Sequence, residues 1–333
     1  MTVALFIPTF NEEKHIETFI TSLLRQDIFD SNYDFKIRFY DGCSNDCTVQ
    51  KIVQFMEDTK LSFSVIENKN RYVAFGFNHF LNDLKSGYLI RMDAHQKYPR
   101  NYLSKLVKLS DKISEFGCIG PRIKMESSDT SLISRSIASV LNSKIGVGNS
   151  IFRTKENFEG IMDVDTVPFG IWRVETLKKV TGMNLELIRN QDDDLNRRLR
   201  EAGKRIILVG DLEVICFPRD TLKKHFQMFY QYGLYKPASK GGLKNILFSR
   251  HILPSILLSI VALLSIFWSF KVFLFLFLTY FALALTVKGE TKSADAIKLL
   301  VLNSFTLFLT HAAYGLGVIK GMIVILTDRK RDF

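Results

Sequence analysis

The sequence contains few cysteines, and those it has are scattered. Only four occur in 333 residues, at Cys43, Cys47, Cys118 and Cys216. A chain of this size with isolated cysteines has no disulfide framework and fits a reducing compartment. Cys43 and Cys47 are close enough to raise the question of a metal, but no Cys or His cluster completes a zinc set. We therefore interpret them as small residues in a turn.

Three further absences exclude classes of protein. No Gly-rich loop follows the first apolar run, Val3–Pro8, which argues against a dinucleotide oxidoreductase. The same run is short and cut by Pro8, so it does not resemble a secretory signal peptide. The net charge is +11 and the pI about 9.4, yet no compact Lys/Arg-rich element with interleaved aromatics occurs. We expect the basic charge to serve an anionic membrane surface rather than a nucleic acid.

The first half of the chain alternates between strand-like and helix-like segments. The patterns predict strands at Val3–Pro8, Phe35–Tyr40, Leu61–Ile66 and Tyr88–Met92, and helices at Glu12–Gln26, Thr48–Met56 and Val73–Leu84. Repeated βαβ units imply an α/β fold, a mostly parallel Rossmann-like sheet with helices on both faces. Ligands bind such sheets beyond the carboxyl ends of the strands. Thr9, Asp41 and Asp93 lie at such ends, so we expect them to share one crevice.

The later segments are more varied. We expect a loop or insertion over the site at Ser127–Arg153, a short helix at Thr176–Val180, a helix at Asp192–Ala202 that ends at Gly203, and a strand at Arg205–Val209. The segment Leu222–Tyr235 is amphipathic. It fits a helix in the membrane interface or a buried amphipathic helix, and the sequence leaves both open.

Three apolar runs follow, at Ile252–Phe270, Val272–Val287 and Leu299–Ile319. A membrane-spanning helix needs about 20 apolar residues. Lysines between the second and third runs predict a cytoplasmic loop, and the tail Asp328–Arg331 is basic as well. One crossing by the third run would put the tail on the wrong side, so that run is re-entrant or interfacial, or the charge rule is overridden. We thus expect a soluble domain at 1–245, with 219–245 as interfacial helix and linker, and a membrane region at 246–333 with two to three transmembrane or re-entrant helices.

Two positions after the fourth predicted strand suit a metal ion. In an extended segment, alternate side chains point the same way, so Asp93 and His95 can approach one cation. One carboxylate and one imidazole suit Mn²⁺ at least as well as Mg²⁺. Such a cation neutralises a diphosphate leaving group. The alternative is a solvated loop.

Other residues near the predicted crevice suit a nucleotide. Asp41 could accept hydrogen bonds from the imide of a uracil, or it could shape a turn, with Asn45 and Asp46 capping the next helix. The segment Pro8–Glu13 fits a wall for the base, with Pro8, Thr9 and Glu12 as binding candidates. Arg71 is a candidate phosphate contact or a solvated surface arginine.

An acidic cluster opens the helix at 192. The positive end of the helix dipole keeps the Asp192 carboxylate ionised, which is the form that a general base needs. Asp193 and Asp194 compete for this role, and ordinary acidic residues at a helix start are the simpler interpretation. Asp194 lies two residues further on and should be turned away from Asp192.

Taken together, these motifs resemble the inverting glycosyltransferases of family 2, which have a GT-A fold, over roughly residues 1–236. Within that family the chain is similar to the succinoglycan-type bacterial exopolysaccharide glucosyltransferases. The resemblance rests on Pro8–Glu13, Asp41–Asp46, Arg91–His95, Asp165–Gly170, Asn190–Leu195 and Tyr232–Lys236, in that order and spacing. A further segment, Gly146–Ser150, resembles one near the sugar pocket of that subgroup.

The resemblance implies roles for individual residues. Asp41 would hold uracil, Asp93 would reach the diphosphate through the metal, and Asp192 would be the catalytic base. The chain departs from the family pattern in three places. Asp93-Ala94-His95 replaces Asp-x-Asp, Gln191 replaces the usual Glu before the base, and Leu234-Tyr235 stands where processive synthases have Gln-x-x-Arg-Trp. The last departure argues against long-chain polymerisation.

The sequence therefore predicts a metal-dependent inverting transferase at the cytoplasmic face of the plasma (inner) membrane. It would move a hexose such as glucose from a UDP-sugar to a saccharide on polyprenyl diphosphate, with membrane lipids as its surroundings and no nucleic acid as partner. The alternatives are a processive synthase, a transferase acting on polyprenyl phosphate, and a non-catalytic nucleotide-sugar-binding assembly partner in which Gln191 marks a decayed site.

Overall fold

The computed structural model describes residues 1–29, 31–148, 150–247, 252–253, 256, 271, 274–276, 278–287 and 295–327. The chain divides into two compact units. The first unit comprises Met1–Lys124 and Lys155–Cys216, and the second comprises Met125–Thr154 and Phe217–Phe333. Residues 125–154 thus belong with the C-terminal helices. The predicted division of function at residue 245 remains a prediction.

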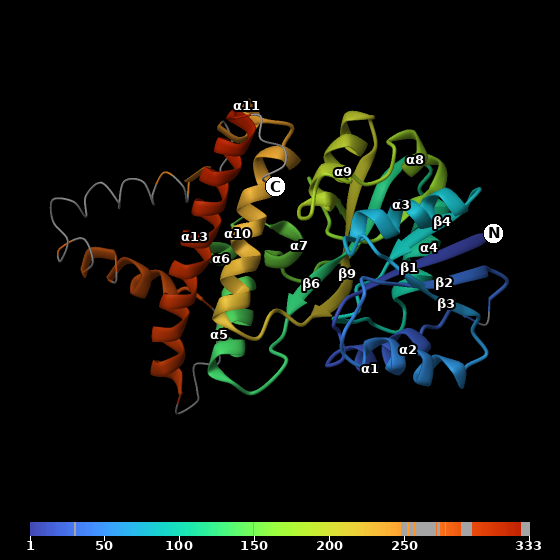
Figure 1. The fold of residues 1–333 in the computed structure, drawn as a ribbon, viewed down its shortest axis with the longest axis horizontal. Coiled ribbons are helices and arrows are strands. Elements are labelled where there is room, and N and C mark those ends of the chain that lie inside the picture. The colour runs from blue at the N-terminus through green and yellow to red at the C-terminus, as the bar shows by residue number, and fades with distance from the viewer. Residues whose placement is uncertain are drawn as a thin grey trace. The chain divides into compact units, whose positions relative to one another are not determined.

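Four parallel strands form one half of the sheet in the first unit (Figure 1). They are β1 (Thr2–Thr9), β2 (Asp34–Asp41), β3 (Phe63–Glu67) and β4 (Tyr88–Arg91), in the order β3-β2-β1-β4. The helices α1 (Ile16–Leu24), α2 (Thr48–Glu57) and α3 (Val73–Asp83) connect them. The run Val3–Ile7 is fully buried, as a central parallel strand requires. The predicted βαβ units are confirmed.

Helices cover both faces of this half. Phe39 and Tyr40 are neighbours on β2, so their side chains point to opposite faces of the sheet. The ring of Phe39 packs edge-on against Phe19 of α1, 6.4 Å between centroids. The ring of Tyr40 lies 5.9 Å from that of Phe80 on α3. Helices α1 and α3 therefore lie on opposite faces of the sheet.

The other half of the sheet pairs antiparallel. It contains β5 (Gln96–Lys97), β6 (Phe116–Met125), β7 (Ile161–Asp163), β8 (Ile171–Arg173) and β9 (Arg205–Cys216). In the described part of the chain the order continues β4-β8-β6-β9-β5, and β7 pairs with β9. Antiparallel pairs join β4 to β8, β6 to β8, and β9 to both β5 and β7. The sheet is therefore mixed, and the sequence predicted only its parallel half.

Three further helices complete the first unit, namely α4 (Tyr102–Lys112), α8 (Val174–Lys179) and α9 (Gln191–Glu201). The helix predicted at 192–202 corresponds to α9. Its N-cap residue, Asn190, has a φ of 61°, in the left-handed region. Beyond its end, Gly203 has a φ of 76°, so the predicted glycine stop is confirmed.

The second unit is helical where a loop was expected. Residues 127–153 contain α5 (Leu132–Leu141), α6 (Lys144–Val147) and α7 (Ile151–Thr154). The hydroxyl of Ser131 caps α5 by accepting a hydrogen bond from the backbone N–H of Ser134. Ile137, Val140 and Leu141 are buried on one side of α5. The loop prediction was wrong because these apolar positions follow helical spacing among many polar residues.

The remaining described helices are α10 (Leu222–Ser239), α11 (Leu243–Leu247) and α13 (Ala296–Leu326). Helices α10 and α13 lie side by side (Figure 1). Their backbones touch at glycines. A Cβ on Gly317 would lie 2.1 Å from the carbonyl oxygen of Tyr230, and one on Gly233 would lie 2.2 Å from that of Tyr314. Glycine is therefore required at both contacts.

The predicted apolar runs are described only in part. Most of the first run, 252–270, lies outside the described residues, as do some positions of the second. An apolar helix extends over Leu274–Ala284, and Tyr280, Ala284 and Val287 join a buried cluster with Val140 and Leu307. The third run falls within α13. Among the described residues, this 31-residue helix alone is long and apolar enough to cross a membrane.

Candidate functional site

Asp41 ends β2 with its carboxylate held by neighbouring side chains. Its Oδ1 accepts hydrogen bonds from the hydroxyls of Thr9 at 3.1 Å and Ser44 at 2.6 Å, and its Oδ2 accepts one from the Ser44 N–H at 2.8 Å. The residue is buried. These contacts fit the turn-shaping interpretation. A carboxylate has about four acceptor positions, however, so a position also remains for a ligand.

Arg71 lies beside the same turn. A Cβ on Gly42 would lie 3.1 Å from the carbonyl oxygen of Arg71. The guanidinium carbon of Arg71 lies 5.9 Å from the centre of the exposed Phe10 ring. Pro8 pairs in register with Tyr40, and Thr9 with Asp41. The structure thus brings together Thr9, Asp41 and Arg71 at the ends of β1 and β2.

Asp93 follows β4 and forms a two-pronged ion pair with Arg91. The Arg91 Nε and Nη2 atoms lie 2.7 and 3.1 Å from the two carboxylate oxygens. Both side chains are nearly buried, 13% and 11% exposed. The backbone N–H of Asp93 donates to the Tyr98 hydroxyl at 2.7 Å, and that hydroxyl donates to Gln96 Oε1 at 2.6 Å. The carboxylate is therefore fixed and charge-compensated.

His95 pairs with Glu12 instead of Asp93. Its Nδ1 atom lies 3.4 Å from Glu12 Oε1, and the Glu12 carboxylate is buried. Burial lowers the pKa of His95, but the Glu12 charge and a hydrogen bond with Cys216 outweigh it and raise the pKa well above its usual value. Only a neutral imidazole binds a metal ion, so the contact with Glu12 opposes metal binding at His95.

Arg91 connects Asp93 to the start of α9. Burial lowers the pKa of Arg91, but the charge of Asp93, their hydrogen bonds and the charge of Asp192 raise it. Burial also raises the pKa of the Cys118 thiol, and the Asp192 charge adds to the effect. The Asp192 charge is therefore close enough to act on both Arg91, the last residue of β4, and Cys118, near the start of β6.

The first turn of α9 presents Asp192 at the helix N-terminus. Gln191 is buried and its amide donates to the carbonyl of Ile188 at 2.6 Å. This neutral side chain packs the turn and adds no second negative charge beside Asp192. Asp192 and Asp193 are half-buried. The dipole of α9 stabilises a carboxylate at this position.

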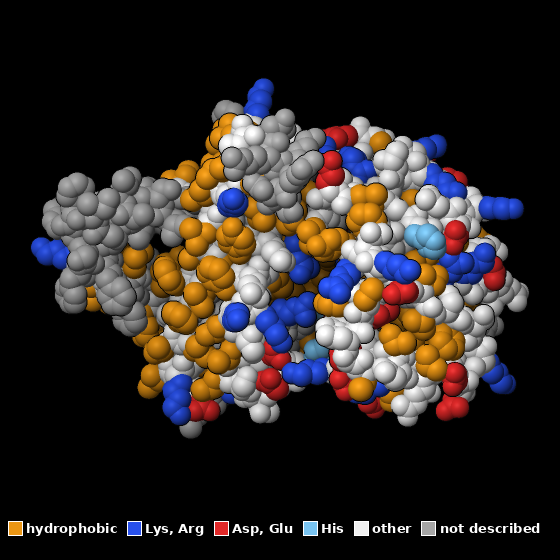
Figure 2. Space-filling model, in the orientation of Figure 1, with side chains coloured by type: hydrophobic (Ala, Val, Ile, Leu, Met, Phe, Trp, Pro, Cys, Tyr) orange, Lys and Arg blue, Asp and Glu red, His pale blue; other side chains and the backbone are white. Residues whose placement is uncertain are grey.

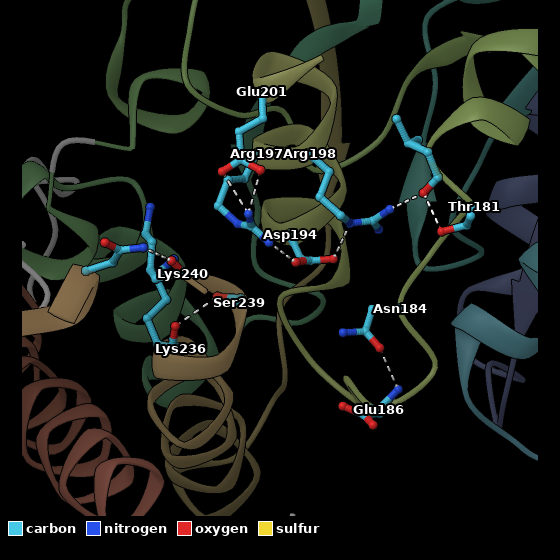
Figure 3. Close-up of polar contacts among 12 residues, drawn as sticks. Thr181, Asn184, Glu186, Asp194, Arg197, Arg198, Glu201, Lys236, Ser239 and Lys240 are labelled. Atoms are coloured by element: carbon cyan, nitrogen blue, oxygen red, sulfur yellow. Dashed lines mark hydrogen bonds and ion pairs between the residues drawn. The ribbon is translucent and has the colours of Figure 1, made fainter. Parts of the chain in front are cut away.

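The carboxylate of Asp194 forms ion pairs with two arginines (Figure 3). Its oxygens lie 2.7 Å from Arg197 Nη2 and 2.8 Å from Arg198 Nε, and the residue is 3% exposed. Arg198 also donates to the carbonyl of Gly182 at 2.7 Å. Asp194 therefore fastens α9 to the preceding loop. This geometry favours Asp192 or Asp193 over Asp194 as the base.

The sequence interpretation missed three residues that hold the site together. They are Arg91 and Tyr98, which hold Asp93, and Asn196, whose amide donates to Thr166 Oγ1 at 2.8 Å and the Val167 carbonyl at 2.7 Å. Asn196 thereby docks α9 on the Asp165–Gly170 segment. The alternation that placed Asp93 beside His95 also places Arg91 beside Asp93, so a signal for Arg91 was present.

In the part of the chain that the structure describes, side chains alone do not form a metal site. Among the described residues, no group of three His, Cys, Asp or Glu residues is arranged to hold a metal ion. Arg91 occupies both oxygens of Asp93, and Glu12 pairs with His95. All four cysteines are free.

Comparisons with known proteins agree with this arrangement. The profile of the family described as "Glycosyl transferase family 2" matches residues 4–171, about half of the chain. The succinoglycan biosynthesis protein ExoA of Rhizobium meliloti is 30% identical over 74% of this chain and 70% of its own length. A dolichyl N-acetyl-α-D-glucosaminyl phosphate 3-β-D-2,3-diacetamido-2,3-dideoxy-β-D-glucuronosyltransferase of Methanococcus voltae is 24% identical over 96% of this chain and 97% of its own length.

Solved structures confirm the fold. The mannosyltransferase PcManGT from Pyrobaculum calidifontis, solved with GDP-Man and Mn²⁺, superposes with a TM-score of 0.55 at 16% identity, over 98% of this chain and 87% of its own. Residues 1–349 of S. aureus TarS superpose with a TM-score of 0.51 at 16% identity, over 99% and 92% of the two chains. The GT-A fold expected from the sequence is therefore confirmed, and the chain belongs to glycosyl transferase family 2.

Proposed function

We propose that this glycosyltransferase moves a hexose such as glucose from a UDP-sugar to a lipid-linked saccharide in polysaccharide biosynthesis, with inversion at the anomeric carbon. The observation that carries the proposal is the position of Asp41 at the end of β2 and of Asp93 just after β4, with Arg91 bound to Asp93 and influenced by the charge of Asp192 at the start of α9. The name of the relative from M. voltae, which contains a dolichyl-linked sugar phosphate, supports the acceptor class, and the name of the relative from R. meliloti supports a role in polysaccharide biosynthesis.

The nucleotide occupies the turn after β2 in this proposal. Asp41 accepts from the imide N–H of uracil, because its carboxylate is held by Thr9 and Ser44 and keeps an acceptor position. Pro8 and Thr9 form the wall beside the base, and Glu12 holds His95. Arg71 contacts phosphate oxygens as a cation at the edge of the same turn.

A divalent cation, Mn²⁺ or Mg²⁺, is the proposed cofactor. Asp93 and His95 are the residues that would hold it, and it would neutralise the charge that develops on departing UDP. Two protein ligands suffice because such ions keep several waters and substrate phosphate oxygens. Arg91 must then release at least one oxygen of Asp93, and the His95 imidazole must bind in its neutral form, free of its contact with Glu12. The structure of PcManGT, which has the same fold and contains Mn²⁺, supports a divalent cation as the cofactor.

Asp192 is the proposed general base. It removes the proton from the acceptor hydroxyl, whose oxygen attacks the anomeric carbon in line as the bond to UDP breaks. The helix start keeps the carboxylate ionised, and Gln191 adds no competing charge. A β-linked product from an α-linked donor follows from this single displacement.

The second unit is proposed to hold the protein at the cytoplasmic face of the plasma membrane. Over α10 and α13, hydrophobic side chains gather on the face shown in Figure 2. The chain also carries a net charge of +11, which favours anionic lipid. A polyprenyl-diphosphate acceptor would place the substrate at the same surface.

A transferase acting directly on polyprenyl phosphate and a processive synthase are the alternative enzymes. The transferase acting on polyprenyl phosphate differs from the proposed enzyme only in its acceptor, so a panel of acceptors distinguishes these two enzymes. The second is disfavoured because Leu234-Tyr235 replaces Gln-x-x-Arg-Trp. A non-catalytic assembly partner is disfavoured because Asp41, Asp93 and Asp192 are all present at the site.

UDP release by the detergent-purified protein tests the proposal. A panel of UDP-sugars with Mn²⁺, Mg²⁺ or EDTA is assayed with polyprenyl-linked saccharides, polyprenyl phosphate and no acceptor. We expect release from one donor that requires both metal and the lipid-linked saccharide and is lost in Asp192→Asn. Release with polyprenyl phosphate alone would overturn the acceptor, and no release in any combination would overturn the enzymatic function in favour of the assembly partner.

A further inference from the structure

Helix α13 carries an apolar stripe along its whole length. Its large exposed hydrophobic residues are Ile297, Val301, Phe305, Leu316, Ile323 and Leu326. At 100° per residue these positions fall on one side of the helix. The side chains at the two extremes are the most exposed, Ile297 at 78% and Leu326 at 71%. Because these exposed apolar side chains extend to both ends of the helix, a binding partner must contact the helix along its axis and not only at its midpoint.

The opposite face of α13 is covered by helices with polar contacts. In the N-terminal half, the hydroxyl of Thr306 lies 2.9 Å from that of Ser136 on α5. Close to the midpoint of the helix, Thr310 Oγ1 lies 2.8 Å from the Nε2 atom of the buried His225 on α10. Gly317 allows close backbone contact with α10 beyond that point. Helix α13 therefore moves together with α5 and α10.

This packing places charged residues level with the middle of α13. The helix runs from Ala296 to Leu326, so its midpoint is His311, one residue from Thr310. The partner of Thr310, His225, lies in the first turns of α10. Lys223 and Lys224 in that turn are exposed, and Lys224 forms an ion pair of 3.2 Å with Asp220. Because α10 is packed against α13, these charged residues stay level with the middle of α13 in any orientation of the helix relative to the membrane.

A perpendicular crossing is incompatible with this register. A 31-residue helix is about 46 Å long, while the hydrocarbon core is about 30 Å thick. Centring α13 in the bilayer would bring Asp220, Lys223 and Lys224 to the midplane, where charges are costly. It would also push Ile297 and Leu326 out of the hydrocarbon. Both consequences disfavour a span.

We infer that α13 lies in the plane of the membrane interface, with its apolar stripe in the acyl chains and α5 and α10 on the aqueous side. The occupant of the stripe is therefore a lipid surface containing anionic headgroups. In the sequence, basic residues both precede α13 (Lys288, Lys292) and follow it (Arg329, Lys330, Arg331), a pattern that the positive-inside rule does not predict for the two ends of a membrane-spanning helix. This inference deepens the membrane association proposed above and rests on it.

Cysteine accessibility separates the two orientations. Lys298 and Thr327 are exposed near the two ends of α13, and Cys47 is an exposed native cysteine in the first unit. Full-length Cys43→Ser protein carrying Lys298→Cys or Thr327→Cys is labelled in sealed, inverted and right-side-out membrane vesicles with an impermeant maleimide. We expect all three sites to react in the same vesicle orientation. Reaction of the two ends of α13 in opposite orientations would overturn the inference.

Depth along the helix gives a second readout. An environment-sensitive fluorophore is placed at Val301→Cys, Phe305→Cys, Leu316→Cys or Ile323→Cys and quenched with lipids that carry the quencher at defined depths. We expect one shallow depth at all four positions, whereas a span would show a maximum of depth at the middle positions. A control at Lys223→Cys should be quenched only from water.

Failure of the inference is distinguishable from failure of membrane association. If the protein floats with vesicles but its helix ends label from opposite sides, α13 spans and only the orientation is wrong. If the protein does not float with anionic vesicles at all, the proposed membrane association is wrong.

Discussion

At the scale of single residues, the site depends on charges that compensate one another. Arg91 forms an ion pair with the carboxylate of Asp93, and the negative charge of Asp192 also raises the pKa of Arg91. The Glu12 carboxylate in turn raises the pKa of His95. Removing one of these charges changes the electrostatic environment of the others. Substitutions at different positions should therefore affect donor binding and catalysis to different extents.

Asp192→Asn should bind the UDP-sugar with nearly unchanged affinity and lose transfer by about 10² to 10⁴-fold, the usual contribution of a general base. The amide is isosteric but accepts no proton at neutral pH. Donor binding by calorimetry and UDP release with acceptor give the two numbers. The matched control is Asp193→Asn, also half-buried in the first turn of α9. Loss of activity in the control alone would move the base to Asp193.

Arg91→Met should strengthen Mn²⁺ binding in the absence of nucleotide by at least about tenfold, or about 1.4 kcal/mol. The reason is that Arg91 and the metal compete for the two oxygens of Asp93. Free Mn²⁺ in titrations is counted by electron paramagnetic resonance. An unpaired buried carboxylate also costs about 3–5 kcal/mol of folding free energy, which a thermal melt reports.

Two controls accompany that substitution. Arg91→Lys keeps the competing cation and should leave Mn²⁺ affinity near that of the wild type. Asp93→Asn should abolish the gain when combined with Arg91→Met. Equal Mn²⁺ affinity in Arg91→Met and the wild-type protein would contradict the competition.

At the scale of elements, loops and helix starts position the site. Asp46 precedes the N-cap residue of α2, which is Cys47 and makes no side-chain cap. The Asp46 Oδ1 accepts from the Thr48 N–H at 3.0 Å, and its Oδ2 accepts from the Glu13 N–H at 3.2 Å. The neighbouring Asn45 is bound differently, because its N–H donates to the side chain of Asn11. One carboxylate therefore ties together the turns after β1 and β2.

The Asp46 carboxylate makes this stability dependent on pH. Burial raises its pKa, but hydrogen bonds from Thr48 and Glu13 outweigh burial and lower it. A lowered folded-state pKa contributes stability above the unfolded-state value of about 3.9, and this is lost as pH falls through the folded value. Asp46→Asn should thus cost about 1 kcal/mol at pH 7 and little near pH 2. Chemical unfolding at both pH values, with exposed Asp58→Asn as control, tests this; a constant difference would refute it.

Gly317→Ala should destabilise the pair of α10 and α13 by about 1–3 kcal/mol through overpacking. The added Cβ would lie 2.1 Å from the carbonyl oxygen of Tyr230, so the backbones must separate. Unfolding in detergent, followed by circular dichroism, measures the loss. Leu316→Ala, on the exposed side of the same turn, should change stability much less, and equal effects would contradict the contact.

At the scale of the whole molecule, the chain combines a family 2 catalytic fold with a helical unit that draws on two separate parts of the sequence. Residues 125–154 pack with 217–333, so Gly146, in the segment that resembles one near the sugar pocket, belongs to the unit proposed to meet lipid. A lipid-linked acceptor would then contact both the second unit and the membrane.

The net charge of +11 should make vesicle binding dependent on anionic lipid and salt. Each basic residue near an anionic surface contributes about 1 kcal/mol, and screening shortens its reach to about 8 Å at physiological salt. We expect affinity for vesicles with anionic lipid to fall at least about tenfold between 0.05 and 0.5 M NaCl, measured by flotation. Neutral vesicles should show weak binding without this slope, and a flat response in both would exclude the electrostatic contribution.

The sequence by itself determined the family, the parallel half of the sheet and the acidic positions at its strand ends, because apolar periodicity and short motifs are local. Long-range pairing was decided only by the tertiary structure. Antiparallel β8 contributes three residues and β5 two, too few to show a pattern. The arginines on Asp194 and the membership of 125–154 in the second unit were likewise invisible, since each depends on which charges and apolar faces meet after folding.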